Sequence, residues 1–227
     1  MKRAGLRAGL AWLREKTRKE WLVRHDILIL RKRLAAPAPS HPRFDVVEHR
    51  AFHEGIVDLY RRFDRDLCES RLRLRFDRGH RFYELREAGR TLATTWAVAG
   101  GERFVDEIGL GFVVTREVAW MRDIFVEPQS RGHGLFAVLL DAVRGRFFTR
   151  AETLWSAVST GNRASVKAHM RFGHEVVVRY DVVHILGRIL LRLRWPERET
   201  GGSSFQIRRR ALLTGPSYRR FIADHLA

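Results

Sequence analysis

A turn containing two glycines separates an apolar stretch from an amphipathic one in residues 126–143, VEPQSRGHGLFAVLLDAV. If a strand ends at Val126 and a helix begins near Leu135, the turn exposes consecutive backbone N–H groups at a helix N-terminus, where the helix dipole favours an anion. Glycines at positions 132 and 134 let the backbone approach a phosphate closely. The spacing therefore predicts an anion-binding turn.

Two familiar phosphate-binding turns fit this segment poorly. A P-loop needs Lys followed by Ser or Thr after its last glycine, and here Leu135 and Phe136 stand in those places. The letters GHGLFA satisfy the dinucleotide pattern G-x-G-x-x-A, but that motif needs a strand running straight into the first glycine and an acid at the end of the next strand. Five residues separate Val126 from the first glycine, and Glu152 precedes the next predicted strand.

The same turn resembles the fingerprint of the GCN5-related N-acetyltransferase (GNAT) superfamily, a strand ending in V-x-P followed by Q/R-x-x-G-x-G/A and a helix. The matching residues are Val126, Pro128, Gln129, Gly132 and Gly134, and Arg131 also fits the R-G-x-G form. A second family element, an Asn followed by a small residue and then by a glycine eleven positions after the Asn, matches Asn162, Ser165 and Gly173. The resemblance covers roughly residues 44–190.

The resemblance implies a site for acyl-coenzyme A as co-substrate and requires no metal. In the family, backbone amides of the glycine turn bind the pyrophosphate, and the pantetheine arm enters between the strand ending at Val126 and the strand ending near Ser159. The Asn-containing turn packs beside this arm. The implied coenzyme A-binding residues are Phe125, Val126, Gln129, Ser130, Arg131, Gly132, His133, Gly134, Asn162 and Ser165. For His133, contact with phosphate and exposure to solvent are both open.

Acyl transfer from a thioester to an amine needs three further groups. A base or a water chain must take a proton from the amine, a donor must polarise the thioester carbonyl, and an acid assists the leaving thiolate. The resemblance assigns carbonyl polarisation to a backbone N–H on the strand ending at Val126. The family's usual acid is a Tyr seven residues after the motif Asn, and this chain has His169 there. His169 is either that proton donor or a surface histidine on a short helix.

The resemblance also suggests where the acceptor amine would lie. Asp123 occupies a strand position that points an acid toward the amine in many relatives, and it would hold the ammonium group or relay its proton. Alternatively, Asp123 is structural, bonded to a neighbouring strand or paired with Arg122. Arg122 stands where relatives carry Glu, which disfavours a polyamine acceptor and permits one with a carboxylate or phosphate. Asp106 and Glu107 are weaker base candidates.

Hydrophobic periodicity predicts the elements that position these residues. Apolar residues at helical spacing indicate a basic amphipathic helix in the first 22 residues and one or two helices between the proline-rich stretch and about residue 70. Strands are expected on both sides of the EAGR turn and in IGLGFVVT, residues 118–126, TLWSAVS, EVVVRY and VVHILG, with helices at 135–146 and 163–172. This order predicts an α/β fold with a mixed, mostly antiparallel central sheet flanked by helices.

The same reading divides the chain into four parts. Residues 1–34 are expected to form a basic amphipathic arm, residues 35–43 a proline-rich linker, residues 44–190 the acyltransferase domain and residues 191–227 a basic extension. The arm is interpreted either as a helix on a membrane interface or as a helix packed onto the domain.

The net charge of +17 lies mainly at the two ends of the chain. Residues 1–33 carry a net +8 and residues 186–227 a net +6, whereas the middle carries only +3. These ends are suited to an anionic membrane surface or an acidic acyl carrier protein. Since 38 of the 43 basic residues are Arg, genome base composition is an equal explanation. Zinc-ligand pairs, a helix-turn-helix pattern and basic–aromatic interleaving on strands were not found, which argues against nucleic acid.

The composition indicates a cytoplasmic globular protein, with peripheral membrane contact left open. The longest uncharged stretch, residues 91–101, is too short to span a membrane, and no secretory signal is recognised. The single cysteine, Cys68, allows no internal disulfide. The oligomeric state is not predicted.

The motifs together predict an acyl-CoA-dependent N-acyltransferase. In its simplest form the enzyme transfers acetyl from acetyl-CoA to a primary amine by direct attack in a ternary complex. The alternatives are an N-acyl amino acid synthase-type enzyme that uses an acyl carrier protein on the same fold, and a module that binds coenzyme A or a membrane without turnover. The identity of the acceptor, a small molecule or a peptide, is left open.

Overall fold

One sheet organises the chain, as seen in a computed structural model that describes residues 22–34, 41–63, 69–185, 188–196 and 205–208. Its strand order is β2-β3-β4-β5-β6-β1-β7-β8, and β9 pairs with β5. The strands are β1 (Leu22–Arg33), β2 (Asp45–His49), β3 (Arg81–Glu87), β4 (Arg90–Val105), β5 (Leu110–Val126), β6 (Thr153–Ser159), β7 (Glu175–Ile185), β8 (Arg188–Pro196) and β9 (Phe205–Arg208). All pairs are antiparallel except β5 with β6, which confirms the predicted mixed α/β fold.

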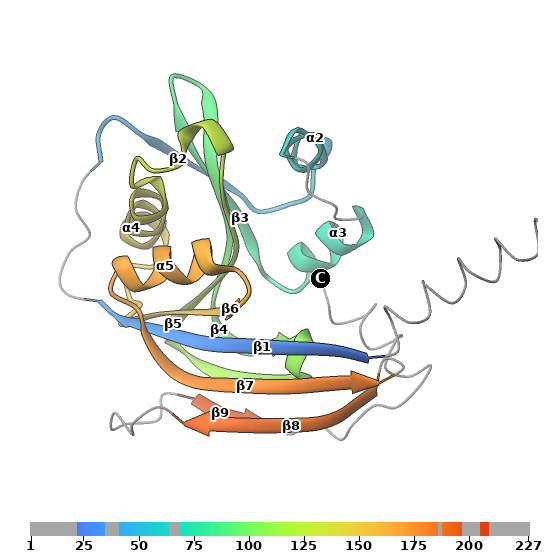
Figure 1. The fold of residues 1–227 in the computed structure, drawn as a ribbon. Helices are drawn as coiled ribbons and strands as arrows, with labels where there is room; N and C mark the ends of the chain where they lie inside the picture. Colours follow the sequence, from blue (N-terminus) through green and yellow to red (C-terminus); the bar gives the residue numbers. More distant parts are fainter. Residues whose placement is uncertain (1–21, 35–40, 64–68, 186–187, 197–204, 209–227) are drawn as a thin grey trace, which may run out of the picture.

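Helices cover both faces of the sheet. The helices α2 (Glu54–Arg62) and α3 (Glu69–Asp77) lie on one face, and α4 (Leu135–Phe147) and α5 (Arg163–Arg171) lie on the other (Figure 1). Because side chains alternate across a strand, Tyr83 and Leu85 of β3 pack with α4, whereas Phe82 packs with α2 and α3. The sheet therefore separates two hydrophobic clusters, one under each pair of helices.

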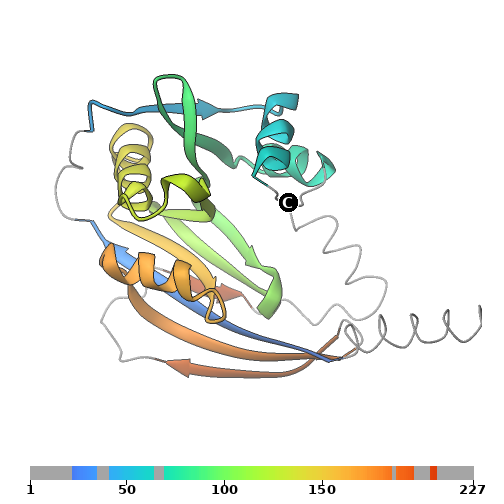
Figure 2. The ribbon, with the colours of Figure 1, turned by 45° about the horizontal axis from the view of Figure 1, so that its top comes forward.

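The strand β1 lies inside the sheet, between β6 and β7, which corrects the expected domain boundary at residue 44 (Figure 2). The positive charge of residues 1–33 places residues 22–33 in the expected basic arm. In the structure Ile29 and Leu30 are fully buried, and the guanidinium of Arg31 donates to Glu175 of β7. The helix predicted in the first 22 residues lies outside the described residues except for Leu22, which begins β1, and most of the linker and Cys68 also lie outside them.

Two strands are longer than the hydrophobic pattern indicated. Residues 110–126 form one strand, β5, although separate strands were expected on either side of the exposed residues 115–117. Likewise, EVVVRY and VVHILG are joined in β7 as far as Ile185. Pairing continues through the charged Asp181 of β7, which lies opposite Asp26 of β1 and Leu193 of β8. Residues 115–117 of β5 instead lie at a register shift between β4 and β5, where the strand runs on through an irregularity. The strands β8 and β9 also extend the sheet beyond the expected boundary at residue 190.

The helices follow the predicted periodicity with modest differences. The helix α4 begins at Leu135 as expected, and α5 begins at Arg163. The strand β2 precedes α2 and was not predicted, and α3 extends beyond the expected helical limit near residue 70 to Asp77. None of the helices in the described ranges is long and apolar enough to cross a membrane.

We predict that truncating a buried side chain of β1 destabilises the whole domain. Leu30 has no exposed surface, so Leu30→Ala should lower the free energy of unfolding by about 3 kcal/mol through lost apolar burial and the cavity left behind. Leu191→Ala removes the same atoms from β8, where the side chain is 45% exposed, and should cost less than about 1 kcal/mol. Denaturant unfolding of both variants measures this difference, and equal losses would contradict a core position for β1.

Candidate active site

The glycine turn forms an open helix N-terminus. After the single turn η2 (Pro128–Ser130), Gly132 and Gly134 both adopt positive φ angles, 83° and 74°, and Gly134 is the N-cap of α4. The first hydrogen bonds of α4 run from Ala137 and Val138 to the Gly134 carbonyl, so N–H groups before them have no acceptor within the helix. A Cβ added at either glycine would meet no atom within 4 Å. The turn therefore leaves room for a ligand.

A carboxylate that the sequence analysis did not single out supports this turn. Glu127 is nearly buried, and its backbone N–H donates to the carbonyl of Leu92 at 2.8 Å. Its Oε2 accepts hydrogen bonds from Arg90 at 2.8 Å and from the Ser130 hydroxyl at 3.1 Å. Glu127 stands directly between the last residue of β5 and Pro128. An acidic residue at this position could have been recognised from the sequence as a supporting group, because a buried carboxylate needs hydrogen-bond partners.

The other residues of the turn divide into supporting and exposed groups. Arg131 donates from Nε to the carbonyl of Val126 at 3.1 Å, and its guanidinium lies over the ring of Phe125. Gln129 and His133 are exposed, and Nδ1 of His133 lies 3.4 Å from the carbonyl of Ser130. The bonds of Arg131 to Val126 and of Glu127 to Leu92, Arg90 and Ser130 therefore restrain the backbone at the start of the turn.

The strands β5 and β6 diverge beside this turn. Their parallel pairing covers only three residue pairs and ends at Trp120 and Trp155. The strand β5 nevertheless continues to Val126 because it stays paired with β4, and β6 continues to Ser159 because it stays paired with β1. The expected splay between these strands is therefore confirmed. Beyond Trp120, none of the described strands pairs with β5 on the side away from β4.

The asparagine turn closes the other side of the splay. Asn162 is the N-cap of α5, and its Oδ1 accepts the backbone N–H of Ser165 at 3.1 Å. This capping explains why an Asn three residues before a small residue begins a helix here. Since α4 follows β5 and α5 follows β6, the two sequence motifs end up on neighbouring helices on one face of the sheet (Figure 1).

His169 lies between these two helices and is not a surface residue. It is 1% exposed, and its ring contacts Phe136 of α4 edge-on, with centroids 4.7 Å apart. Nδ1 donates to the carbonyl of Ser165 at 2.8 Å, whereas the buried Nε2 has no hydrogen-bond partner. Burial lowers the pKa of His169, although the bond to Ser165 opposes this shift. The favoured form is thus neutral, with the proton on Nδ1 and a lone pair on Nε2.

Asp123 lies at a bulge in the splayed part of β5. The register between β4 and β5 shifts between Thr94 and Trp96, and Asp123 has a φ of 49°, which side-chain-bearing residues rarely adopt. Its Oδ2 lies 2.6 Å from Nη1 of Arg75, a residue of α3 that is only 3% exposed. The carboxylate is therefore paired with Arg75 of α3, and not with Arg122 or through a neighbouring strand, the two structural alternatives expected from the sequence.

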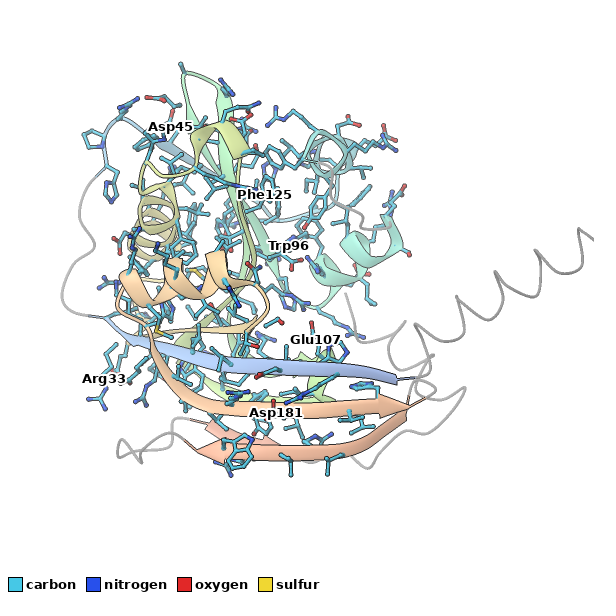
Figure 3. The ribbon with its side chains drawn as sticks, in the orientation of Figure 1. Arg33, Asp45, Trp96, Glu107, Phe125 and Asp181 are labelled. Carbon is cyan, nitrogen blue, oxygen red and sulfur yellow. The ribbon has the colours of Figure 1, made fainter. Side chains whose placement is uncertain are left out.

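The two weaker base candidates are in η1 (Asp106–Ile108) at the far end of the long β4–β5 hairpin. Glu107 is exposed, and its backbone carbonyl accepts a hydrogen bond from His184 of β7 at 2.8 Å. Figure 3 shows Glu107 beside β1 and Phe125 well above it, near the glycine turn. The side chain of Asp106 lies outside what the structure describes. Among the described residues, no group of His, Cys, Asp and Glu is arranged to hold a metal ion.

Comparisons with known proteins agree with the two sequence motifs. The family model described as the acetyltransferase (GNAT) family matches residues 48–174. None of the curated proteins compared matches this chain.

Similar solved structures include a GCN5-related N-acetyltransferase from Kribbella flavida, with 13% identity, a TM-score of 0.43 and coverage of 77% of this chain and 62% of that one. One from Sphaerobacter thermophilus has 17% identity, a TM-score of 0.45 and coverage of 82% and 56%. A GNAT-family acetyltransferase from Colwellia psychrerythraea has 14% identity, a TM-score of 0.41 and coverage of 72% and 56%. The chain therefore spans about three fifths of the length of these proteins.

We predict that acid destabilises this protein through a buried histidine behind the site. Burial, and then the neighbouring His169, lowers the pKa of His174 to about 3. An unfolded histidine binds its proton near pH 6.5, so between pH 6.5 and about 3 the unfolded state holds the extra proton. As the pH is lowered through this window, the free energy of unfolding should decrease, and this residue should contribute about 1.4 kcal/mol per pH unit to the decrease.

His174→Asn tests this origin of the pH dependence. The Asn amide can still donate to the carbonyl of His169, as Nδ1 of His174 does, but it does not titrate. Denaturant unfolding at several pH values should show a shallower loss for this variant and the wild-type loss for the exposed control His133→Asn. An unchanged slope in His174→Asn would contradict the prediction.

Proposed function

The chain belongs to the GNAT family of acetyltransferases, and on this premise we propose that it transfers an acyl group, acetyl in the simplest case, from coenzyme A to a primary amine. The observation that carries the proposal is the open N-terminus of α4, with two positive-φ glycines, at the end of a strand that has separated from its parallel neighbour. Each of these features suits one part of an acyl-CoA molecule.

The glycine turn would bind the pyrophosphate. The backbone N–H groups at the start of α4 are hydrogen-bond donors, and the helix dipole adds partial positive charge there. Gln129, Ser130, Arg131 and His133 line the same turn, while Phe125 and Val126 precede it. We assign these residues, with Asn162 and Ser165 on the neighbouring turn, to coenzyme A binding.

The splay would receive the pantetheine arm and the thioester. Residues of β5 beyond Trp120 present backbone groups toward the space that β6 leaves, and an N–H among them would polarise the thioester carbonyl. Polarisation by a backbone group needs no titration and little reorganisation, because the strand is held in place by β4.

Asp123 would hold the acceptor's ammonium group before attack. Its ion pair with Arg75 stabilises the carboxylate form, and the side chain is still 28% exposed. A carboxylate held in its charged form is a weak base, so we assign it electrostatic positioning of the amine, with water accepting the proton.

His169 is proposed to give a proton to the departing thiolate. In its neutral form, Nδ1–H is already donated to Ser165 and Nε2 carries no proton. Donation therefore requires the imidazolium form, which burial disfavours. Proton donation by His169 is consistent with its contact with Phe136, because Phe136 belongs to α4, the helix that begins after Gly134.

Incubation of the purified protein with acetyl-CoA and a panel of primary amines, followed by mass spectrometry, tests the proposed reaction. Acetylated product that requires the protein supports it. A parallel reaction with an acyl carrier protein as donor distinguishes the two donor classes. Binding of coenzyme A with no product from either donor would indicate a binding module instead.

We predict that Gly134→Val weakens coenzyme A binding at least tenfold, about 1.4 kcal/mol, because the side chain would occupy the space in front of the turn. Gly79→Val is the matched control, since Gly79 has a similar φ of 78° and equally open surroundings but lies between α3 and β3. Both variants carry backbone strain, but only the first should change the affinity in calorimetric titrations. Equal affinities for the two variants would argue against the turn as the pyrophosphate site.

We predict that His169→Phe lowers kcat with little change in the KM for acyl-CoA, because a proton donor acts on the leaving group rather than on binding. Phenylalanine is apolar and of similar size, so packing against Phe136 should be largely kept. Steady-state kinetics measure the effect. If His169→Phe keeps the wild-type kcat between pH 6 and 9, His169 has a packing role and is not the proton donor.

A further inference from the structure

Two consecutive residues of β5 share one face of the sheet. Arg122 pairs with Trp96, whose side chain is packed among α2 and α3. Regular alternation would turn Asp123 to the opposite face, toward α4 with Met121. The bulge and the positive φ of Asp123 instead direct its carboxylate to Arg75 of α3. The strand therefore presents a guanidinium and a carboxylate side by side, facing α3.

A buried network fixes the position of this carboxylate. The guanidinium of Arg75 lies 5.0 Å from the centroid of the Trp96 ring and 3.5 Å from the Tyr60 hydroxyl. Nε1 of Trp96 donates to the same hydroxyl at 2.8 Å. Figure 3 shows Trp96 between the sheet and α3, below Phe125. Since Arg75 of α3 is contacted by Tyr60 of α2 and Trp96 of β4, Asp123 of β5 has a rigid partner.

Several guanidinium groups lie near one another at this face. Among the described residues, no carboxylate lies within ion-pairing distance of Arg122. Burial, and then Arg122, lowers the pKa of the nearby Arg103 to about 10. Burial, together with the charges of Arg103, Arg122 and Arg75, lowers the pKa of His80 to about 3. Three guanidiniums are thus close enough to disfavour another positive charge, with Asp123 bound to one of them.

His80 adds an unsatisfied polar atom to this cluster. It is 6% exposed, its backbone N–H donates to the carbonyl of Arg75 at 3.0 Å, and its buried Nδ1 has no hydrogen-bond partner. A neutral imidazole nitrogen can donate or accept according to its tautomer. A ligand with polar groups would relieve both this unsatisfied atom and the crowding of like charges.

We propose that the acceptor is an amine that also carries an anionic group, a carboxylate or a phosphate, and that Arg122 binds this group while Asp123 holds the ammonium. This proposal rests on the proposed function. The two side chains are adjacent and opposite in charge, so they fit the two ends of a small zwitterion such as an amino acid. Arg75 and Arg103 add positive potential around the anion.

The location of the pair suits an acceptor rather than the donor. The glycine turn begins α4, and α4 and α5 cover one face of the sheet, whereas α3 covers the other (Figure 1). Arg122 and Asp123 face α3, because Arg122 pairs with Trp96 and Asp123 contacts Arg75. Both residues belong to the part of β5 that has left β6. An amine held there could approach the splay from the side opposite the coenzyme.

The test compares amines that differ only in the anionic group. Glycine and glycinamide form one pair, and O-phosphoethanolamine and ethanolamine form the other. The kcat/KM ratio of charged to uncharged amine should fall at least tenfold in Arg122→Gln, because a charge-assisted contact is lost. Comparing this ratio between proteins removes the intrinsic reactivity of each amine. Arg122→Lys should keep part of the preference.

Arg116→Gln is the matched control, since Arg116 lies on the same strand, is exposed and carries the same charge. It should leave both ratios unchanged. Calorimetric titration with O-phosphoethanolamine in the presence of coenzyme A gives a second readout, and Arg122→Gln should weaken this binding tenfold or more.

Two outcomes would overturn the proposal in different ways. If the protein binds coenzyme A and acetylates amines, but Arg122→Gln leaves the ratios unchanged or matches Arg116→Gln, the anionic acceptor is wrong and acyl transfer stands. If the wild-type protein neither binds coenzyme A nor acetylates any of the four amines, the proposed function fails and this inference fails with it.

Discussion

The strand β5 pairs with two strands, β4 and β6, that diverge from each other, so it cannot stay hydrogen-bonded to both along its whole length. The candidate site depends on which of these pairings is kept. It keeps its hydrogen bonds to β4 as far as Val126, but its bonds to β6 end at Trp120. A bulge bends a strand and increases its local twist, and the bulge at Asp123 lies within the stretch that has separated from β6. The left-handed backbone of Asp123 is a cost that the buried ion pair with Arg75 helps to offset. One irregular residue thus accompanies both the opening in the sheet and the carboxylate beside it.

This arrangement separates the tasks of the two faces. The face covered by α4 and α5 carries the exposed glycine turn, the exposed Asn162 cap and the buried His169. The face under α2 and α3 carries charged groups beside the packed aromatic rings of Phe82 and Trp96. A reaction between a large anionic donor and a small polar acceptor benefits from this separation, because each partner can enter without displacing the other.

The sequence predicted the parts of the site that depend on local geometry. The glycine turn, the Asn162 cap and the ends of β6 follow from helix capping and apolar runs, which act within a few residues. The ion pair between Arg75 and Asp123 joins a helix to a bulge 48 residues away in the chain, and neither residue has a local signal for it. The burial of His169 was also missed, because its contact with Phe136 links two helices that periodicity treats separately. For the same reason, β1 was read as part of a basic arm, since its partners lie at the other end of the chain.

The place of β1 also has a consequence for how the protein is made. Ile27 pairs with Ser159 and with Tyr180, so the first described strand must wait for segments synthesised more than a hundred residues later. At about 5–20 residues per second, the apolar run of β1 leaves the ribosome roughly 7–30 s before both partners exist. During that interval the apolar residues of β1 have no strand to pair with and are exposed in the nascent chain. Pairings of such long sequence separation also slow folding once the chain is complete. Closure of the sheet around β1 is therefore a late event in biogenesis.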